Sequence, residues 1–406
     1  MVDTDFAWRL TQGLVRIDSS DPGAYESEIE RYIKALVEER LAQLSHPVLD
    51  AVQIAELEVL PGRRNLMITV PGVSDEPRLV YICHMDTVTL GDGWDADITP
   101  LGAVVRDGKL YGRGACDMKG GLACAIAALV HTLERVAADG ALPRRGFSLI
   151  CSVDEEDFMR GSEAAIDAGW VGSREWVLDT EPTDGQIQVA HKGRTWFEIE
   201  MDGVTAHASR PWKGADAVAA MAEVVCSLRR AFAALPVHNE LGPSTITFGQ
   251  IEGGYRPYVV PDHAKVWVDM RLTPPTDTAA ATRMVEQAIA VAEAAVPGCH
   301  GSYTVTGDRP AIERDPNSPL LAALKRAADD VTDADTTVGF FTGYTDTAVI
   351  AGKTGNRNCM SYGPGSLALA HKPNEYVPHA DIVRCQQVLI ALADNVLWDA
   401  SGQVGA

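Results

Sequence analysis

The sequence predicts an α/β protein with two domains, one inserted into the other. Short apolar strands alternate with helices up to about residue 190, which is typical of a mostly parallel sheet flanked by helices. Residues 191–307 follow the order β-α-β-β-α-β, which is that of a ferredoxin-like α+β unit. The alternation of short strands and helices seen before residue 190 resumes near Pro316. We therefore expect one discontinuous domain formed by residues 1–190 and 308–406, with residues 191–307 inserted between its two parts.

The elements of the first part follow from the spacing of apolar residues. Residues 3–45 are predicted to be largely helical, because their second half places apolar side chains at helical spacing. Residues 119–138 form the strongest predicted helix, which begins with a pair of glycines and is rich in leucine. The remaining apolar segments are short, and the predicted strands span residues 54–60, 65–70, 78–83, 147–153 and 176–179.

The inserted segment has a different pattern. Residues 196–201 alternate between apolar and polar side chains, as a strand with one buried face does. The pattern then predicts helices at 214–234 and 278–296 and strands at 244–251, 264–272 and 301–307.

Composition narrows the function classes. The chain has 406 residues, of which 46% are hydrophobic and 22% charged, as in a soluble globular protein. Its 35 basic and 56 acidic side chains give a net charge of −21, which repels phosphate backbones and anionic lipids, so we expect no nucleic-acid or membrane partner. We see no signal peptide and no run near the roughly 18–20 apolar residues of a membrane span. We therefore expect a cytoplasmic protein.

Acidic residues and histidines recur where predicted strands end. They are His84, Asp86, Asp117, Glu155, Glu156, Asp179, Glu181 and, in a later Gly/Pro-rich loop, His371. In an open α/β sheet, ligands bind beyond the carboxyl ends of the strands. Two imidazoles together with several carboxylates suit zinc without any cysteine ligand. The pattern therefore indicates a hydrolytic metalloenzyme.

Taken one at a time, these positions leave alternatives open. His84 and Asp86 share a strand face, so one can bind metal while the other orients the imidazole, but a polar strand end has the same pattern. Asp117 precedes a helix, where a carboxylate either caps the helix or bridges two ions. Glu155 and Glu156 are adjacent, so one can bind metal while the other acts on water, although an exposed acidic loop is the alternative.

Four further positions are ambiguous for different reasons. Asp179 and Glu181 share strand parity, so the sequence alone does not select the ligand. A lone loop histidine such as His371, or His207 in the inserted segment, is usually a surface residue. Only the joint pattern favours a metal site.

Seven separated motifs resemble the di-zinc aminoacylase and carboxypeptidase family. The motifs are YICHMDTV, LYGRGACDMKGG, SVDEE, LDTEPT, GVTAHASRP, VDMRLTP and YGPGSLALAHKPNEYV, and they span roughly residues 80–380 in the family's order. That family includes acetylornithine deacetylase, succinyl-diaminopimelate desuccinylase, the aminoacylases and glutamate carboxypeptidase. The resemblance implies a zinc-peptidase-like catalytic domain with an inserted ferredoxin-like lid, which the periodicity indicates independently.

The resemblance gives each residue of the metal set a role. It implies two Zn²⁺ ions per subunit, with Co²⁺ or Mn²⁺ as substitutes. His84 is expected to bind one ion, and Glu156 and His371 the other. Asp117 is expected to bridge both ions and to be followed by a cis peptide, and Glu181 is the remaining carboxylate ligand.

The resemblance also implies the reaction. Asp86 is expected to orient His84, while Glu155, as general base, generates a zinc-bound hydroxide that attacks the amide bond of an N-acyl amino acid. On the lid, His207 is expected to stabilise the oxyanion and Arg271 to grip the substrate carboxylate. Relatives commonly dimerise through the lid, so we expect a homodimer.

Substrate identity stays open. Tyr258 stands where relatives commonly have an asparagine, so the substrate pocket is expected to differ. A dipeptidase or a glutamate-type carboxypeptidase acting on short peptides would use the same metal site. A non-catalytic metal-binding relative would use the lid for binding or assembly. No GxSxG elbow or phosphate-binding loop favours a serine hydrolase or a nucleotide-binding protein.

Overall fold

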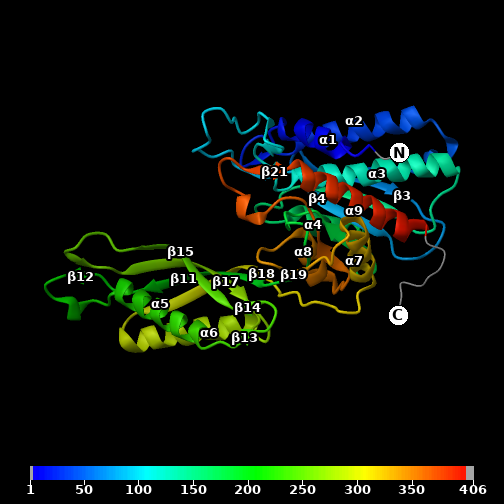
Figure 1. Cartoon of the computed structure of the whole chain (residues 1–406). Coiled ribbons are helices and arrows are strands. Elements are labelled where there is room, and N and C mark those ends of the chain that lie inside the picture. Colours follow the sequence, from blue (N-terminus) through cyan, green and yellow to red (C-terminus); the bar gives the residue numbers. More distant parts are fainter. Residues whose placement is uncertain (1–2, 399–406) are drawn as a thin grey trace. The chain divides into compact units, whose positions relative to one another are not determined.

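The computed structural model describes residues 3–398, and the chain forms two compact units (Figure 1). The first unit combines Met1–Val189 with Arg314–Phe341 and Thr345–Ala406. The second unit consists of Ala190–Glu313 and the short segment Thr342–Tyr344. Along the chain, the second unit therefore interrupts the first.

An eight-stranded sheet forms the centre of the first unit. Its strands, in spatial order, are β19 (Val338–Phe341), β10 (Ile187–His191), β20 (Cys359–Ser361), β9 (Trp176–Asp179), β4 (Leu79–His84), β8 (Phe147–Ser152), β3 (Arg63–Val70) and β2 (Gln53–Leu60). The central strands β20, β9, β4 and β8 are parallel, whereas β10, β3 and β2 pair in antiparallel fashion. The predicted α/β class is confirmed, with parallel pairing in the middle of the sheet.

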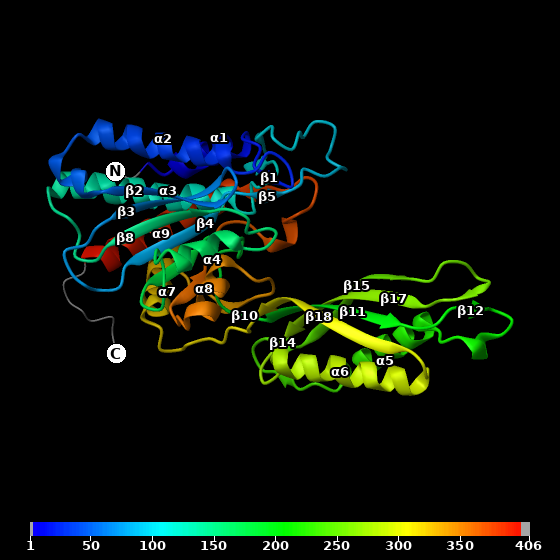
Figure 2. The same cartoon turned by 180° about the vertical axis from the view of Figure 1, so that it is seen from behind.

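Helices cover both faces of this sheet (Figures 1 and 2). On one face, the long helix α3 (Lys119–Asp139) packs against β4 and β8, and α1 (Phe6–Val15), α2 (Ser27–Leu44) and α9 (His379–Trp398) pack against α3. On the other face, α4 (Arg160–Asp167) contacts β2 and β3, and α8 (Asp346–Thr354) contacts β4 and β9. Helix α7 (Pro319–Thr332) packs against α9.

Helix α3 is the apolar centre of the helical layer. Within residues 3–398 it is the one helix long and apolar enough, with a mean hydropathy of 1.4, to cross a membrane by length and composition. Our sequence-based expectation that no run approaches such a span overlooked it. However, 72% of that window is buried inside the protein, which is the property of a core helix. Leu122, Ile126 and Leu129, for example, are completely buried.

The segment that we predicted to be largely helical, residues 3–45, contains α1 and α2 with a loop between them. In this loop, β1 (Ser20–Asp21) pairs in parallel with β5 (Thr87–Val88). The loop therefore lies beside the chain that leaves β4. The remaining short elements of the first unit are η1 (Pro47–Ala51), β6 (Val104–Arg106), β7 (Lys109–Tyr111), η3 (Leu367–Leu369) and β21 (Tyr376–Pro378).

The second unit has its own sheet and its own hydrophobic core. Its main elements, in chain order, are β11 (Gly193–Asp202), α5 (Ala217–Ala233), β15 (Thr245–Gly253), β17 (His263–Leu272), α6 (Thr278–Ala295) and β18 (His300–Arg309). The four strands form an antiparallel sheet in the order β15-β17-β11-β18, as in a ferredoxin-like fold. Its minor elements are β12 (Ala206–His207), η2 (Pro211–Lys213), β13 (Val237–His238), β14 (Gly242–Pro243) and β16 (Val259–Val260).

Candidate metal centre

The predicted ligands of the first unit converge at the carboxyl edge of its parallel strands. His84 is the last residue of β4, Glu155 and Glu156 follow β8, and Glu181 follows β9. Asp117 lies just before α3, and His371 lies in the loop between η3 and β21. Residues that are far apart in sequence therefore meet at one edge of a rigid sheet, as ligand sites of this architecture do.

Asp117 lies between the two histidines. Its Oδ1 is 3.2 Å from His84 Nε2, and its Oδ2 is 3.5 Å from His371 Nε2. The Asp117–Met118 peptide is cis, as expected. Because each carboxylate oxygen faces a different imidazole, Asp117 has the geometry of a bridging ligand between two ions.

Two groups of ligand atoms can each surround an ion. His84, Asp117 and Glu156 form one group, and His84, Glu155 and Glu181 form the other, with all atoms of a group within 4.8 Å of one another. His371 Nε2 extends the first group, since it lies 2.9 Å from Glu156 Oε2. In the second group, His84 Nε2 is 3.7 Å from Glu181 Oε1 and 4.0 Å from Glu155 Oε2.

The electrostatics of the cluster favour a cation. Burial, with neighbouring carboxylates, raises the pKa of Glu155 and of Glu181 well above the ordinary value. Hydrogen bonds to Asp117 and Glu156 raise the pKa of His371 to about 10, so its imidazole is protonated when no metal competes. Glu156 Oε1 is buried without a hydrogen-bond partner in the part of the chain that the structure describes. Imidazoles, carboxylates and an unpaired buried oxygen fit divalent metal ions.

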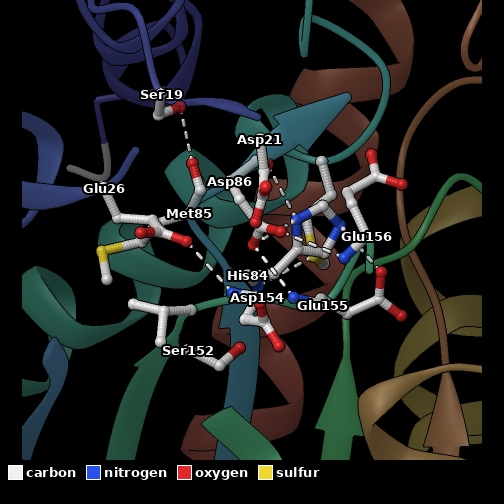
Figure 3. A network of polar contacts seen from close by, with 12 residues as sticks. Ser19, Asp21, Glu26, His84, Met85, Asp86, Ser152, Asp154, Glu155 and Glu156 are labelled. Atoms are coloured by element: carbon white, nitrogen blue, oxygen red, sulfur yellow. Dashed lines mark hydrogen bonds and ion pairs between the residues drawn. The ribbon is translucent and has the colours of Figure 1, made fainter. Parts of the chain in front are cut away.

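Asp86 organises this edge in two ways (Figure 3). Its main-chain oxygen lies 2.9 Å from His84 Nδ1, so Nδ1 carries the proton and Nε2 is left free for a metal ion. Its carboxylate accepts the backbone N–H groups of Glu155 (3.2 Å) and Glu156 (3.0 Å). His84 Nδ1 also lies 3.6 Å from Asp86 Oδ1, and the predicted orienting role of Asp86 stays a prediction.

The structure distinguishes Glu181 from Asp179, whose shared strand parity left the choice of ligand open. Glu181 lies beside His84, as described above. Asp179 instead accepts a hydrogen bond from the Thr347 hydroxyl (2.7 Å) and belongs to neither ligand group. Of the two, Glu181 therefore has the position of a ligand.

Arg113 and Glu375 lie beside the candidate site, and we did not single them out from the sequence. Glu375 Oε1 accepts the N–H groups of Cys116 (2.8 Å) and Asp117 (3.1 Å). Arg113 Nη1 lies 2.6 Å from Glu375 Oε2, and both side chains are almost fully buried. The pair thus holds the backbone that carries the bridging carboxylate. Glu375 lies in the motif YGPGSLALAHKPNEYV, but its contact with a backbone segment far away in the chain leaves no signal in the surrounding sequence.

A third acidic group, Asp21, Glu26 and Asp86, lies beside the site but already has its cation. The Arg63 guanidinium lies 2.7 Å from Asp21 and 2.5 Å from Glu26. We therefore do not regard this group as a metal site.

The other two predicted site residues lie on the second unit. His207, in β12, is exposed, and its Nδ1 lies 2.9 Å from the Ser209 hydroxyl. Arg271, in β17, is paired with Asp269, whose two carboxylate oxygens lie 2.8 and 3.1 Å from its guanidinium nitrogens. Tyr258 is 62% exposed on this unit. The roles of His207 and Arg271 stay predictions.

Fold and site together define a metal-dependent hydrolase. The family model described as peptidase family M20/M25/M40 matches residues 80–395, so this chain belongs to that family. The chain is 26% identical over 399 residues to a probable succinyl-diaminopimelate desuccinylase of Staphylococcus epidermidis, covering 91% of this chain and 92% of the relative. It is also 26% identical over 332 residues to an acetylornithine deacetylase of Myxococcus xanthus, covering 80% and 82% of the two chains.

Solved structures share the fold at lower identity. The aminopeptidase PepT of Bacillus cereus superposes with a TM-score of 0.75 at 22% identity, covering 96% of this chain and 98% of the other. A dinuclear metal-binding peptidase of the M20 family from Bacillus subtilis superposes with a TM-score of 0.70 at 17% identity, covering 97% and 99%. The predicted fold and family are therefore confirmed.

Proposed function

We propose that this protein hydrolyses the amide bond of an N-acyl amino acid, with two divalent metal ions, in the first place zinc, in the centre around Asp117. The observation that carries this proposal is the bridging position of Asp117 between His84 and His371, with Glu155 beside it. When bound, such ions lower the pKa of a water molecule from about 15.7 towards ~7 and polarise a carbonyl.

The ligands divide around the bridging carboxylate. His84 and Glu181 lie on the side of Asp117 Oδ1, and Glu156 and His371 lie on the side of Oδ2. Each side offers one imidazole and one terminal carboxylate. This symmetry supports a pair of ions of the same kind.

Glu155 is the proposed general base. It is almost fully buried at the carboxyl edge, and its backbone is fixed by Asp86. Burial raises the pKa of its carboxyl well above the ordinary value. A base whose pKa lies nearer to neutral can take a proton from water and hold it until the departing amine accepts it.

The second unit is proposed to complete the reaction. His207 is exposed and free to donate a hydrogen bond to a developing oxyanion. Arg271 is proposed to grip the substrate carboxylate, with Asp269 keeping its guanidinium in place. We further propose that two chains form a homodimer through this unit.

The names of the sequence relatives favour an acylated amino acid as substrate. The desuccinylase and the deacetylase align over most of this chain, whereas the likeness to solved peptidases supports the fold. The test is a panel of N-succinyl and N-acetyl amino acids and dipeptides, assayed with and without a chelator. Release of a free acid supports the proposal, release of two amino acids indicates a dipeptidase, and turnover that survives chelation contradicts it.

A further inference from the structure

The loop after β8 has its first four backbone N–H groups bound by side chains from other parts of the chain. The last two bind the Asp86 carboxylate, as described above. The first two bind side chains outside the predicted metal set. Val153 N–H donates to Asn65 Oδ1 (3.1 Å), and Asp154 N–H donates to Glu26 Oε1 (3.0 Å). The loop that carries Glu155 is thus fixed at each residue from Val153 to Glu156. Figure 3 shows Glu26 and Asp86 beside the last three of these residues.

Glu26 is itself fixed by an arginine. Its side chain is completely buried just before α2, and Arg63 Nε donates to its Oε2 over 2.7 Å. Arg63 is 8% exposed and also pairs with Asp21 over 2.7 Å. A buried ion pair of this kind has little freedom to move, because breaking it leaves an uncompensated charge. Glu26 Oε1 is therefore a fixed acceptor for Asp154 N–H.

Asn65 joins the two ends of the same loop. It is completely buried in β3, where it accepts the Val153 N–H and donates from Nδ2 to the Gly161 carbonyl over 2.8 Å. Val153 begins the loop, and Gly161 lies in the first turn of α4. One amide side chain thus sets the distance between the end of β8 and the start of the next helix.

The backbone needs this support because it turns at Asp154. This residue has a φ of 66°, a left-handed conformation that is strained for a residue with a Cβ. Its carboxylate accepts a bond from Arg160 Nε over 2.6 Å, which fixes the turn from the other side. The turn directs the next two side chains, Glu155 and Glu156, into the metal centre.

From these contacts we propose that Glu26 and Asn65 are positioning residues for Glu155 and Glu156, with Arg63 locking Glu26. They act through the backbone of the loop, at a distance from the reacting atoms. The catalytic part of this inference rests on the proposed function, whereas its structural part does not. It parallels the pair Arg113 and Glu375, which holds the loop of the bridging carboxylate in the same way.

The test compares Glu26→Ala, which removes the acceptor, with Glu26→Gln, which keeps an oxygen for the Asp154 N–H. In the metal-loaded enzyme, we expect Glu26→Ala to lower kcat about 10- to 100-fold with KM within about twofold, because a misplacement near 1 Å has effects of this size. Amide exchange of residues 153–156 should become at least about tenfold faster. Glu26→Gln should recover most of both losses.

Glu30→Gln is the matched control. Glu30 is also a buried glutamate, four residues further along the chain in α2, and within residues 3–398 it makes no hydrogen bond or ion pair with the loop. We expect its kcat and its amide exchange in residues 153–156 to equal those of the wild type. If Glu26→Ala does not fold, Asn65→Ala is compared with Asn65→Asp, which keeps the oxygen that accepts the Val153 N–H, loses the donor to Gly161 and leaves Arg63 undisturbed.

Unchanged exchange in the loop of a folded Glu26→Ala or Asn65→Ala variant would overturn the inference. So would faster exchange with an unchanged kcat, since the loop would then not position the base. The exchange measurement needs no substrate. If the wild type hydrolyses no amide, the proposed function fails, while the exchange result still decides whether these residues hold the loop.

Discussion

The Glu155→Gln variant tests whether Glu155 acts as the general base and not as a metal ligand. The amide has the shape of the carboxylate, and the backbone N–H of residue 155 still reaches Asp86, so the loop should keep its position. Loss of a general base typically lowers the rate about 10²- to 10⁴-fold. At about 1.36 kcal/mol per tenfold change, this corresponds to roughly 3–5 kcal/mol of transition-state stabilisation.

The same substitution should leave folding intact. Because burial raises the folded-state pKa of Glu155, the stability linked to its protonation is present at low pH and lost as pH rises through that pKa. The metal-free Glu155→Gln variant should therefore be at least as stable as the wild type at pH 8. The assay is kcat together with metal content per chain and a thermal unfolding scan. A kcat within tenfold of the wild type, or loss of both metal ions, would refute the assigned role.

Three further predictions concern the surroundings of the site. Glu375→Ala should weaken metal binding about 10- to 100-fold, measured by competition with a chelator, because it removes the acceptor of the Cys116 and Asp117 N–H groups; unchanged affinity would argue against this role. Glu181→Gln should lose bound metal, whereas Asp179→Asn should keep the wild-type metal content, and the reverse outcome would exchange their roles. Burial and the neighbouring Glu56 raise the pKa of Glu30 to about 7, so the stability linked to its protonation is complete below about pH 4.5 and is lost as pH rises through 7. The Tm of Glu30→Gln relative to the wild type should therefore increase from pH 5 to pH 8. A Tm difference that is the same at both pH values would contradict the raised pKa of Glu30.

The sequence predicted the fold and the residues that gather as candidate metal ligands because both have local signatures. Apolar strands such as β4 and β8 are visible as short runs, and a charged residue directly after such a run stands out. Strand parity alone did not separate Asp179 from Glu181, and Glu181 was predicted only through the family resemblance; in the structure Glu181 lies beside His84, whereas Asp179 contacts Thr347. Periodicity also gave no information on which strands at the sheet edges run antiparallel.

The residues that hold the loops were missed for a physical reason. Glu26, Asn65 and Glu375 act by accepting backbone N–H groups of segments far away in the chain. Such a contact depends on the fold, and it leaves no spacing or composition signal around the acceptor. Sequence patterns therefore indicate candidate metal ligands more readily than the residues that hold those ligands in place.

The most direct test of the dinuclear centre is a titration of the metal-free protein with Zn²⁺, in which turnover of an N-acyl amino acid is followed against the number of ions bound per chain. We predict that two ions bind and that activity, absent in the chelated protein, returns as the sites fill. In the Asp117→Ala variant, which lacks the bridging carboxylate, binding of both ions should weaken together. A wild-type protein that binds no more than one ion at saturation, or that turns over substrate without any, would contradict the account.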